Sequence, residues 1–182
     1  MKIEGESLVP GPRERVFALF VDEAVLRRCV PGVKKLEREG EDRFAGTLEV
    51  GVGSVKGVYD GTVTFKERAP PERLVMQVEA KGKQGFAKGT GSLRFEGVEA
   101  GGRPATRVVY EGDVQVGGTI ASVGQRMVQG AAKVMAGQFF AAIEAEAKAL
   151  EAQAPPPRQG PFLNLVRWLL SVVRGLLRPR AA

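Results

Sequence analysis

Histidine is absent from the 182 residues, and cysteine occurs once, as Cys29. Without histidine, the chain cannot build a Ser–His–Asp triad, a histidine-ligated metal site or the commonest general base at neutral pH. A single thiol excludes an intrachain disulfide, a thiolate zinc site and an iron–sulfur cluster. This cysteine usage suits a reducing cytoplasm, and we expect Cys29 to be a packed thiol rather than a reactive one.

Long apolar runs are also missing. No stretch of 18 or more uncharged apolar residues occurs, so we expect no membrane-spanning helix. The first ten residues contain no apolar segment of the kind that a secretory signal peptide needs.

The basic charge is confined to one end of the chain. Five of the 27 basic residues lie in residues 152–182, which hold no acidic residue, whereas residues 1–151 carry 22 bases and 21 acids. A nucleic-acid-binding protein usually has a basic face on its folded body. We therefore expect no nucleic-acid partner.

Catalytic and cofactor-binding motifs are not visible. The sequence has no GxSxG, no phosphate-binding GxxxxGK loop and no metal-ligand spacing. The GxG at Gly51-Val52-Gly53 precedes an alternating strand pattern rather than a helix, so it does not indicate a dinucleotide site. We expect no catalytic residues, no metal ligands and no covalently bound cofactor.

Apolar periodicity predicts an α+β fold. A first strand ends at Pro10-Gly11-Pro12, and two short helices follow at 13–21 and 24–29. Period-two alternation, punctuated by Gly and Pro, then predicts six further strands with short turns and antiparallel neighbours. A long Ala-rich pattern at 119–151 predicts a helix in the concavity of the sheet. The six predicted strands span residues 33–40, 42–51, 54–68, 73–82, 86–99 and 104–116.

Glycine recurs among the inward-facing residues of these strands. Gly57 and Gly61 share a parity with apolar residues of one strand, and Gly112 does so in the last strand. Such glycines either mark bulges where the sheet bends or leave room for a ligand, and both explanations stay open. Glycines at 124, 130 and 137 cost about 1 kcal/mol each in a helix, and they indicate either close approach of the sheet or a thinner helix beside a pocket.

We therefore predict a ligand cavity between the sheet and the long helix. One face of the helix carries Met127 and Val134, with Met135 beside them. Phe86 is placed near the mouth, because it begins a strand among glycines. The predicted lining comprises Val55, Tyr59, Val63, Leu74, Met76, Phe86, Tyr110, Val114, Met127, Val134 and Met135. Two of these, Tyr59 and Tyr110, are able to polarise a ligand oxygen, as are Lys56 and Lys88, if they face the cavity.

The last part of the chain predicts a separate unit. We divide the sequence into a ligand-binding domain at 1–151, a Pro-rich linker at 152–160 and a basic amphipathic tail helix at 161–182. At helical spacing, the arginines of the tail fall on one narrow polar stripe and the rest of the surface is apolar. This pattern is typical of a helix lying flat in a membrane interface, although packing against protein is the alternative. The predicted membrane-binding residues are Phe162, Leu165, Arg167, Trp168, Leu169, Val172, Arg174, Leu176 and Arg178.

The order of these elements is that of the helix-grip fold, a curved seven-stranded antiparallel sheet around a long C-terminal helix. Local motifs make the resemblance more specific: Pro31-Gly32 after the second helix, Gly51-Val52-Gly53 with its flanks from Val50 to Gly57, Gly85-Phe86-Ala87-Lys88-Gly89, and Val116-Gly117-Gly118 before Thr119. With these motifs, residues 1–148 resemble the CoxG family of carbon monoxide dehydrogenase subunits, within the START-like superfamily of ligand-binding proteins.

The resemblance implies a non-catalytic protein that binds a hydrophobic small molecule. Members of this family are linked to the attachment of a molybdenum hydroxylase complex, of the carbon monoxide dehydrogenase type, to the membrane. We accordingly expect a cytoplasmic protein, peripheral on the inner face of the cell membrane, with a quinone as a candidate ligand. Two alternatives stay open: a small-molecule cyclase, dehydratase or hydrolase on the same fold, and a lipid or metabolite carrier without a hydroxylase partner.

Overall fold

The computed structural model describes residues 1–153. The chain divides into a compact unit at Met1–Ala152 and a second unit at Gln153–Ala182. The predicted Pro-rich linker, from residue 154 onward, and the predicted membrane-binding residues at 161–178 lie outside the described residues.

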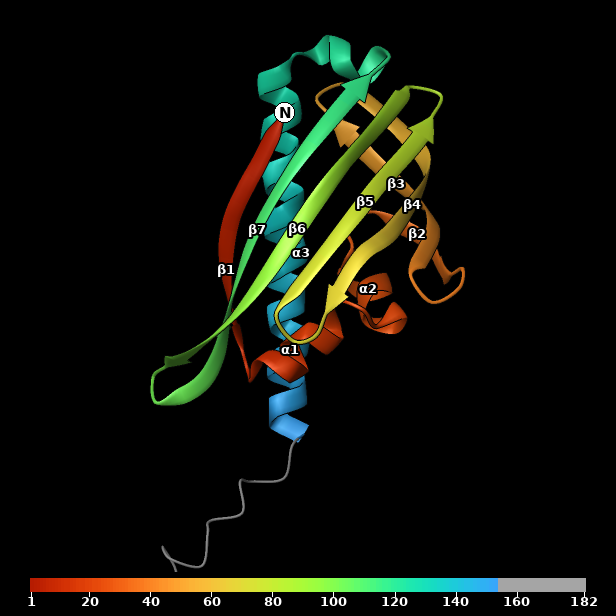
Figure 1. The fold of residues 1–182 in the computed structure, drawn as a ribbon. Helices are drawn as coiled ribbons and strands as arrows, with labels where there is room; N and C mark the ends of the chain where they lie inside the picture. The colour runs from red at the N-terminus through yellow and green to blue at the C-terminus, as the bar shows by residue number, and fades with distance from the viewer. Residues whose placement is uncertain (154–182) are drawn as a thin grey trace, which may run out of the picture. The chain divides into compact units, whose positions relative to one another are not determined.

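The described residues form one curved sheet, one long helix and a few short helical segments (Figure 1). The sheet is antiparallel throughout and has the order β1-β7-β6-β5-β4-β3-β2. Tight turns between successive strands from β2 to β7 impose this meander. The strands are β1 (Lys2–Pro10), β2 (Val33–Arg38), β3 (Arg43–Val52), β4 (Val55–Ala69), β5 (Arg73–Gly82), β6 (Gly85–Ala100) and β7 (Arg103–Gly117).

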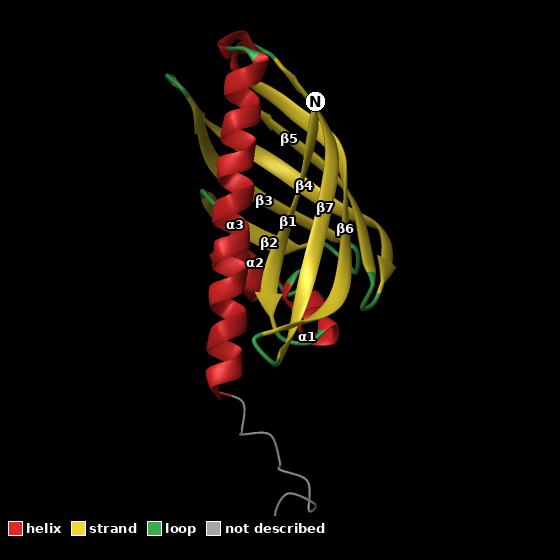
Figure 2. Cartoon of the chain, turned by 90° about the vertical axis from the view of Figure 1, so that its left-hand side faces the viewer, coloured by secondary structure: helices red, strands yellow, loops and turns green. Residues whose placement is uncertain are grey.

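Helices cover the concave side and close one end of the sheet (Figure 2). The helices α1 (Arg13–Leu19) and α2 (Glu23–Cys29) lie between β1 and β2 in the sequence, at one end of the sheet. The long helix α3 (Gln125–Gln153) runs along the concave side. This arrangement confirms the helix-grip fold predicted from the sequence, and the strands begin and end within a few residues of their predicted limits.

The prediction of one continuous helix from residue 119 is wrong. Thr119–Val123 forms a separate 3₁₀ turn, η1, and α3 begins only at Gln125. The break falls at Gly124, whose φ of 94° is incompatible with a right-handed helix. Glycine at this position therefore turns the chain between two helical segments rather than thinning one helix.

The hydrophobic core lies where α1, α2 and the C-terminal half of α3 meet the sheet. Phe20, the C-cap residue of α1, packs edge-on against Phe95 of β6 and Phe139 of α3, with ring centroids 5.1 and 5.7 Å apart. Val9 and Ile143 are fully buried in the same cluster. This end of the grip is therefore solid.

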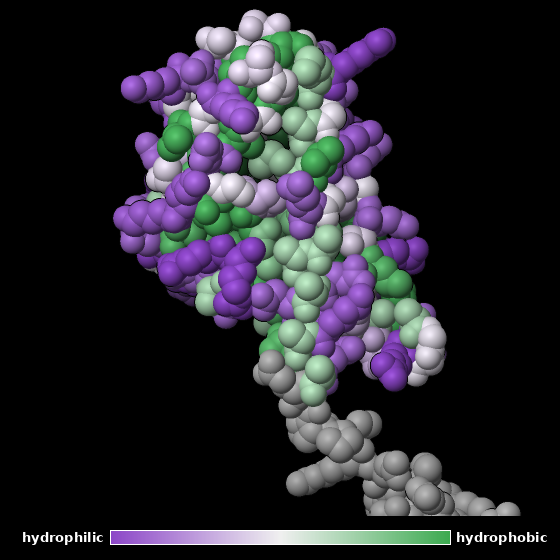
Figure 3. Space-filling view, turned by 180° about the vertical axis from the view of Figure 1, so that it is seen from behind, coloured by the Kyte–Doolittle hydropathy of each residue, from purple (hydrophilic) through white to green (hydrophobic). Residues whose placement is uncertain are grey.

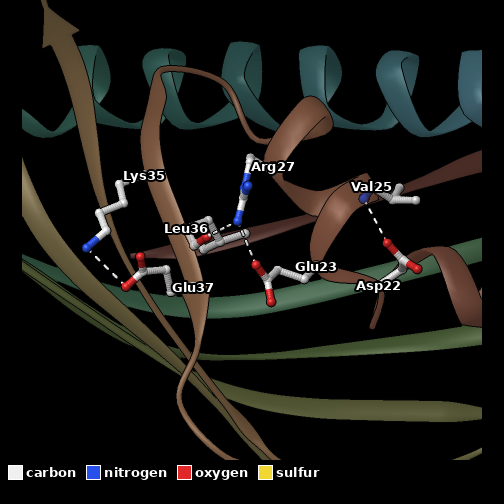
Figure 4. A network of polar contacts seen from close by, with 7 residues as sticks. All are labelled: Asp22, Glu23, Val25, Arg27, Lys35, Leu36 and Glu37. Carbon is white, nitrogen blue, oxygen red and sulfur yellow. Dashed lines mark hydrogen bonds and ion pairs between the residues drawn. The ribbon is translucent and has the colours of Figure 1, made fainter.

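Polar contacts fix α2 against β2 (Figure 4). The Asp22 carboxylate caps α2 by accepting a hydrogen bond from the Val25 amide at 2.9 Å. Arg27 donates to the Glu23 carboxylate at 2.6 Å and to the Leu36 carbonyl at 2.8 Å. The helix and the edge strand therefore keep a fixed separation along one side of the concave face.

A second ion pair joins α2 to α3 across 118 residues of sequence. Arg28 donates through Nε and Nη2 to the two carboxylate oxygens of Glu146, at 2.6 and 2.8 Å. These hydrogen bonds hold the pKa of Glu146 below its ordinary value. The neighbouring Cys29 thiol is buried, and burial raises its pKa, so the thiol is in the protonated, packed form at neutral pH.

Candidate ligand-binding cavity

A cavity of about 430 Å³ lies between the sheet and α3. This volume falls within the range of about 300–1,000 Å³ typical of small-molecule sites. Figure 3, which views the molecule from behind, shows apolar side chains gathered around a hollow in the upper half of this face. Apolar residues between α1 and β2, together with one face of α3, complete the wall that the central strands begin: Phe20, Leu26, Val30, Pro31, Leu36, Met135, Ala136, Phe139 and Phe140.

The side chains that face the cavity from β6 and β7 are small or apolar. Strand alternation points Ala87, Gly89 and Gly91 inward from β6, and it points Lys88 outward. Glu111 of β7 likewise belongs to the outer face, where its carboxylate accepts a hydrogen bond from the Ser92 hydroxyl at 3.3 Å. The charged residues beside the cavity therefore contribute backbone, and their side chains lie outside.

Two glycines form the floor of the cavity. Gly91 and Gly112 are cross-strand partners on β6 and β7, and both line the cavity. A Cβ at Gly91 would lie 3.6 Å from the Glu111 carbonyl oxygen and 3.8 Å from Met76 Cγ, which are ordinary contacts. The backbone would therefore accept a side chain at Gly91, and glycine leaves room above the sheet.

Other strand glycines have a different role, because an aromatic ring of the adjacent strand lies over each of them. A Cβ at Gly82 would lie 3.0 Å from the Tyr59 ring, and the other two pairs are as close or closer. The rings occupy the space that a side chain would need, so these glycines are required by packing. The three cross-strand pairs are Tyr59–Gly82, Tyr110–Gly5 and Phe86–Gly117. The sequence left bulge and ligand space open as explanations for strand glycines, and ring packing is a third.

Five of the eleven residues predicted to line the cavity meet there: Val63, Met76, Tyr110, Val114 and Met135. The other six lie elsewhere, and the prediction needs correction for each. Leu74 is fully buried in the solid core, and Tyr59 lies over Gly57 and Gly82, beyond the end of the cavity. Val55 begins β4 outside the lining residues. Phe86 has outward parity and covers Gly117, so it is not at the mouth.

The remaining two corrections concern the rotation of α3 about its axis. Met127 is 50% exposed and Val134 is 60% exposed, whereas Met135 and Phe139 face the cavity. The glycines at 130 and 137 share the outer face, and a Cβ at either would meet nothing within 4 Å. Neither close approach of the sheet nor a pocket therefore explains these two glycines.

Several lining residues were not predicted, most clearly Gly89 and Gly91 of β6 and Phe139 and Phe140 of α3. A usable signal existed in β6, because residues 87, 89, 91 and 93 share the inward parity and the first three are small. For α3, the sequence offered two apolar faces and no means of choosing between them.

One buried polar atom has no partner within residues 1–153, the hydroxyl of Tyr59. The residue is 3% exposed, and burial raises the pKa of its phenol. In the same part of the chain, no group of three His, Cys, Asp or Glu residues is arranged to hold a metal ion. None of the helices at 1–153 is long and apolar enough to cross a membrane.

Solved structures share this architecture. A conserved protein from Geobacillus kaustophilus is 30% identical, with a TM-score of 0.76 over 82% of this chain and 96% of its own. The ZhuI aromatase/cyclase from Streptomyces sp. R1128 is 15% identical, with a TM-score of 0.61 over 81% of this chain and 93% of its own. A START superfamily protein from Mycobacterium smegmatis is 16% identical, with a TM-score of 0.60 over 82% and 98% of the two chains.

The two more distant likenesses show the fold alone, which is one that binds lipophilic ligands. No curated protein matches the chain in sequence. The model of the carbon monoxide dehydrogenase family CoxG matches residues 5–148, which is nearly the whole folded unit. With its curved sheet, its closing helix and this match, the chain belongs to the CoxG family of carbon monoxide dehydrogenase subunits.

Proposed function

We propose that this protein is a non-catalytic accessory protein that holds a lipophilic ligand and couples a molybdenum hydroxylase of the carbon monoxide dehydrogenase type to the membrane. The observation that carries the proposal is the cavity, whose inward-facing side chains are almost all apolar. No carboxylate or ammonium group of residues 1–153 points into it from β6 or β7, and this supports binding rather than acid–base catalysis.

A quinone is the candidate ligand within this proposal. A dehydrogenase at a membrane has to pass its electrons to a lipid-soluble carrier, and a quinone is such a carrier. Its apolar ring and chain match the chemistry of the wall, where Phe20, Phe139 and Phe140 offer aromatic surface. The proposal assigns no redox role to residues of this chain.

Extraction of the purified protein tests ligand binding directly. The protein is prepared without detergent, extracted with organic solvent, and the extract is analysed by mass spectrometry. We expect a lipid or quinone at close to one molecule per cavity. Extracts without any lipophilic compound, from protein that also fails to take up an added lipophilic probe, would contradict the proposal.

Membrane attachment is the second part of the proposal, and it depends on the sequence of the tail. Full-length protein should float with anionic liposomes, and protein ending at Ala154 should stay at the bottom of the gradient. The physical reason is that residues 161–178 combine a wide apolar surface with arginines, each of which adds about 1 kcal/mol of attraction to anionic lipid.

Two variants separate an electrostatic anchor from non-specific sticking. Arg167→Glu combined with Arg174→Glu should reduce flotation, and added salt should weaken the binding of the unmodified protein. Equal flotation of the full-length and shortened proteins would remove the membrane part of the proposal, and it would leave the ligand-binding part intact.

A further inference from the structure

The chain has two tyrosines, and both belong to the inward-facing set of the sheet. Tyr110 lines the cavity, whereas Tyr59 does not. The other lining residues with polar side chains, Lys88, Thr90, Ser92 and Glu111, have outward parity on β6 and β7. Tyr110 therefore carries the single polar side-chain group that these two strands direct into the cavity.

The Tyr110 ring is fixed from two sides. It stacks on Phe140 of α3, with ring centroids 4.8 Å apart and an interplanar angle of 22°. On β1 it lies over Gly5, its cross-strand partner, so that a Cβ at that position would collide with the ring and the hydroxyl. Because the ring is clamped between β1 and α3, its hydroxyl is held in place before any ligand arrives.

The Tyr110 hydroxyl makes no hydrogen bond to any residue in the described part of the chain. A phenol in this setting has one proton to donate, and the apolar wall around it offers no acceptor. A ligand that brings an oxygen acceptor to this point satisfies both partners. A pure hydrocarbon of the same shape leaves the hydroxyl without a partner.

From this geometry, and on the basis of the proposed function, we propose that Tyr110 is the specificity-determining residue of the cavity. Its hydroxyl donates a hydrogen bond to a carbonyl or ether oxygen of the ligand beside β1. The apolar remainder of the ligand lies over Gly91 and Gly112 and against Met76. The cavity thus selects an elongated apolar molecule with an oxygen acceptor at one end.

A matched pair of probes tests this selection. The probes are 2-octyl-1,4-naphthoquinone and 2-octylnaphthalene, which share the ring system and the chain and differ in the two carbonyl oxygens. Delipidated full-length protein is titrated with each by calorimetry. Tyr110→Phe keeps the ring and its stack on Phe140, and it should weaken binding of the quinone roughly 2- to 12-fold, the range of one neutral hydrogen bond. Binding of the naphthalene should change less than twofold.

Tyr59→Phe is the matched control, because it deletes the same hydroxyl from the same sheet face outside the cavity. It should change binding of neither probe, and thermal unfolding should show both variants folded. A Tyr110→Phe variant that weakens both probes equally, or neither, would overturn the role of the hydroxyl while leaving the proposed function standing. A wild-type protein that binds neither probe would overturn the proposed function, and this inference with it.

Discussion

Gly91→Leu should reduce the affinity for a lipophilic probe at least tenfold and leave the protein folded. The four added carbon atoms would enter the cavity, because the position has inward parity and its Cβ would meet only ordinary contacts at 3.6 and 3.8 Å. Filling an apolar void also buries new apolar surface, at about 0.8 kcal/mol for each methylene-sized group, so the free energy of unfolding should stay level or rise. Probe titration together with urea unfolding measures both effects.

Gly61→Leu is the counterpart of this variant on the neighbouring strand β4. Gly61 has the same inward parity but does not line the cavity, and a Cβ there would lie 3.2 Å from the Glu79 carbonyl oxygen and 3.4 Å from Leu48. We expect it to lower the free energy of unfolding by about 1–3 kcal/mol through overpacking, with little change in affinity at temperatures where it is folded. Wild-type affinity in Gly91→Leu would mean that the ligand is held elsewhere.

The two classes of strand glycine show where sequence information ended. Period-two alternation was enough to identify inward-facing residues such as Val63 and Tyr110, because side-chain direction in a strand follows local geometry. The partner of each glycine depends on strand register, which the turns and bulges set. The bulge after Phe65, for example, shifts β4 against β5 by one residue. A ring of one strand over a glycine of the next was therefore not visible in the sequence.

The long helix was placed correctly and rotated wrongly. Residues 125–153 contain so many alanines that apolar residues follow both faces, and a count of helical spacing did not distinguish them. The choice between the faces came from the bulky residues that the sheet accommodates, with Phe140 and Ile143 in the core and Val134 at the surface. That difference has a direct thermodynamic consequence.

Ile143→Ala should lower the free energy of unfolding by about 2–5 kcal/mol. Ile143 is 0% exposed and belongs to the core cluster in which α3 meets the sheet, so truncation removes buried apolar surface and leaves a cavity in the solid end of the grip. This is a large share of the stability of a domain of this size, typically about 5–15 kcal/mol. Urea unfolding followed by far-ultraviolet circular dichroism gives the value.

Val134→Ala provides the matched control on the same helix, nine residues earlier. Its side chain is 60% exposed, so truncation removes little buried surface, and alanine is the better helix former. The free energy of unfolding should change by no more than about 0.5 kcal/mol, with a small gain as the favoured direction. If Val134→Ala cost as much as Ile143→Ala, α3 would have to present its other face to the sheet. The cavity wall built from Met135 and Phe139 would then be wrong as well, because both residues turn with the helix.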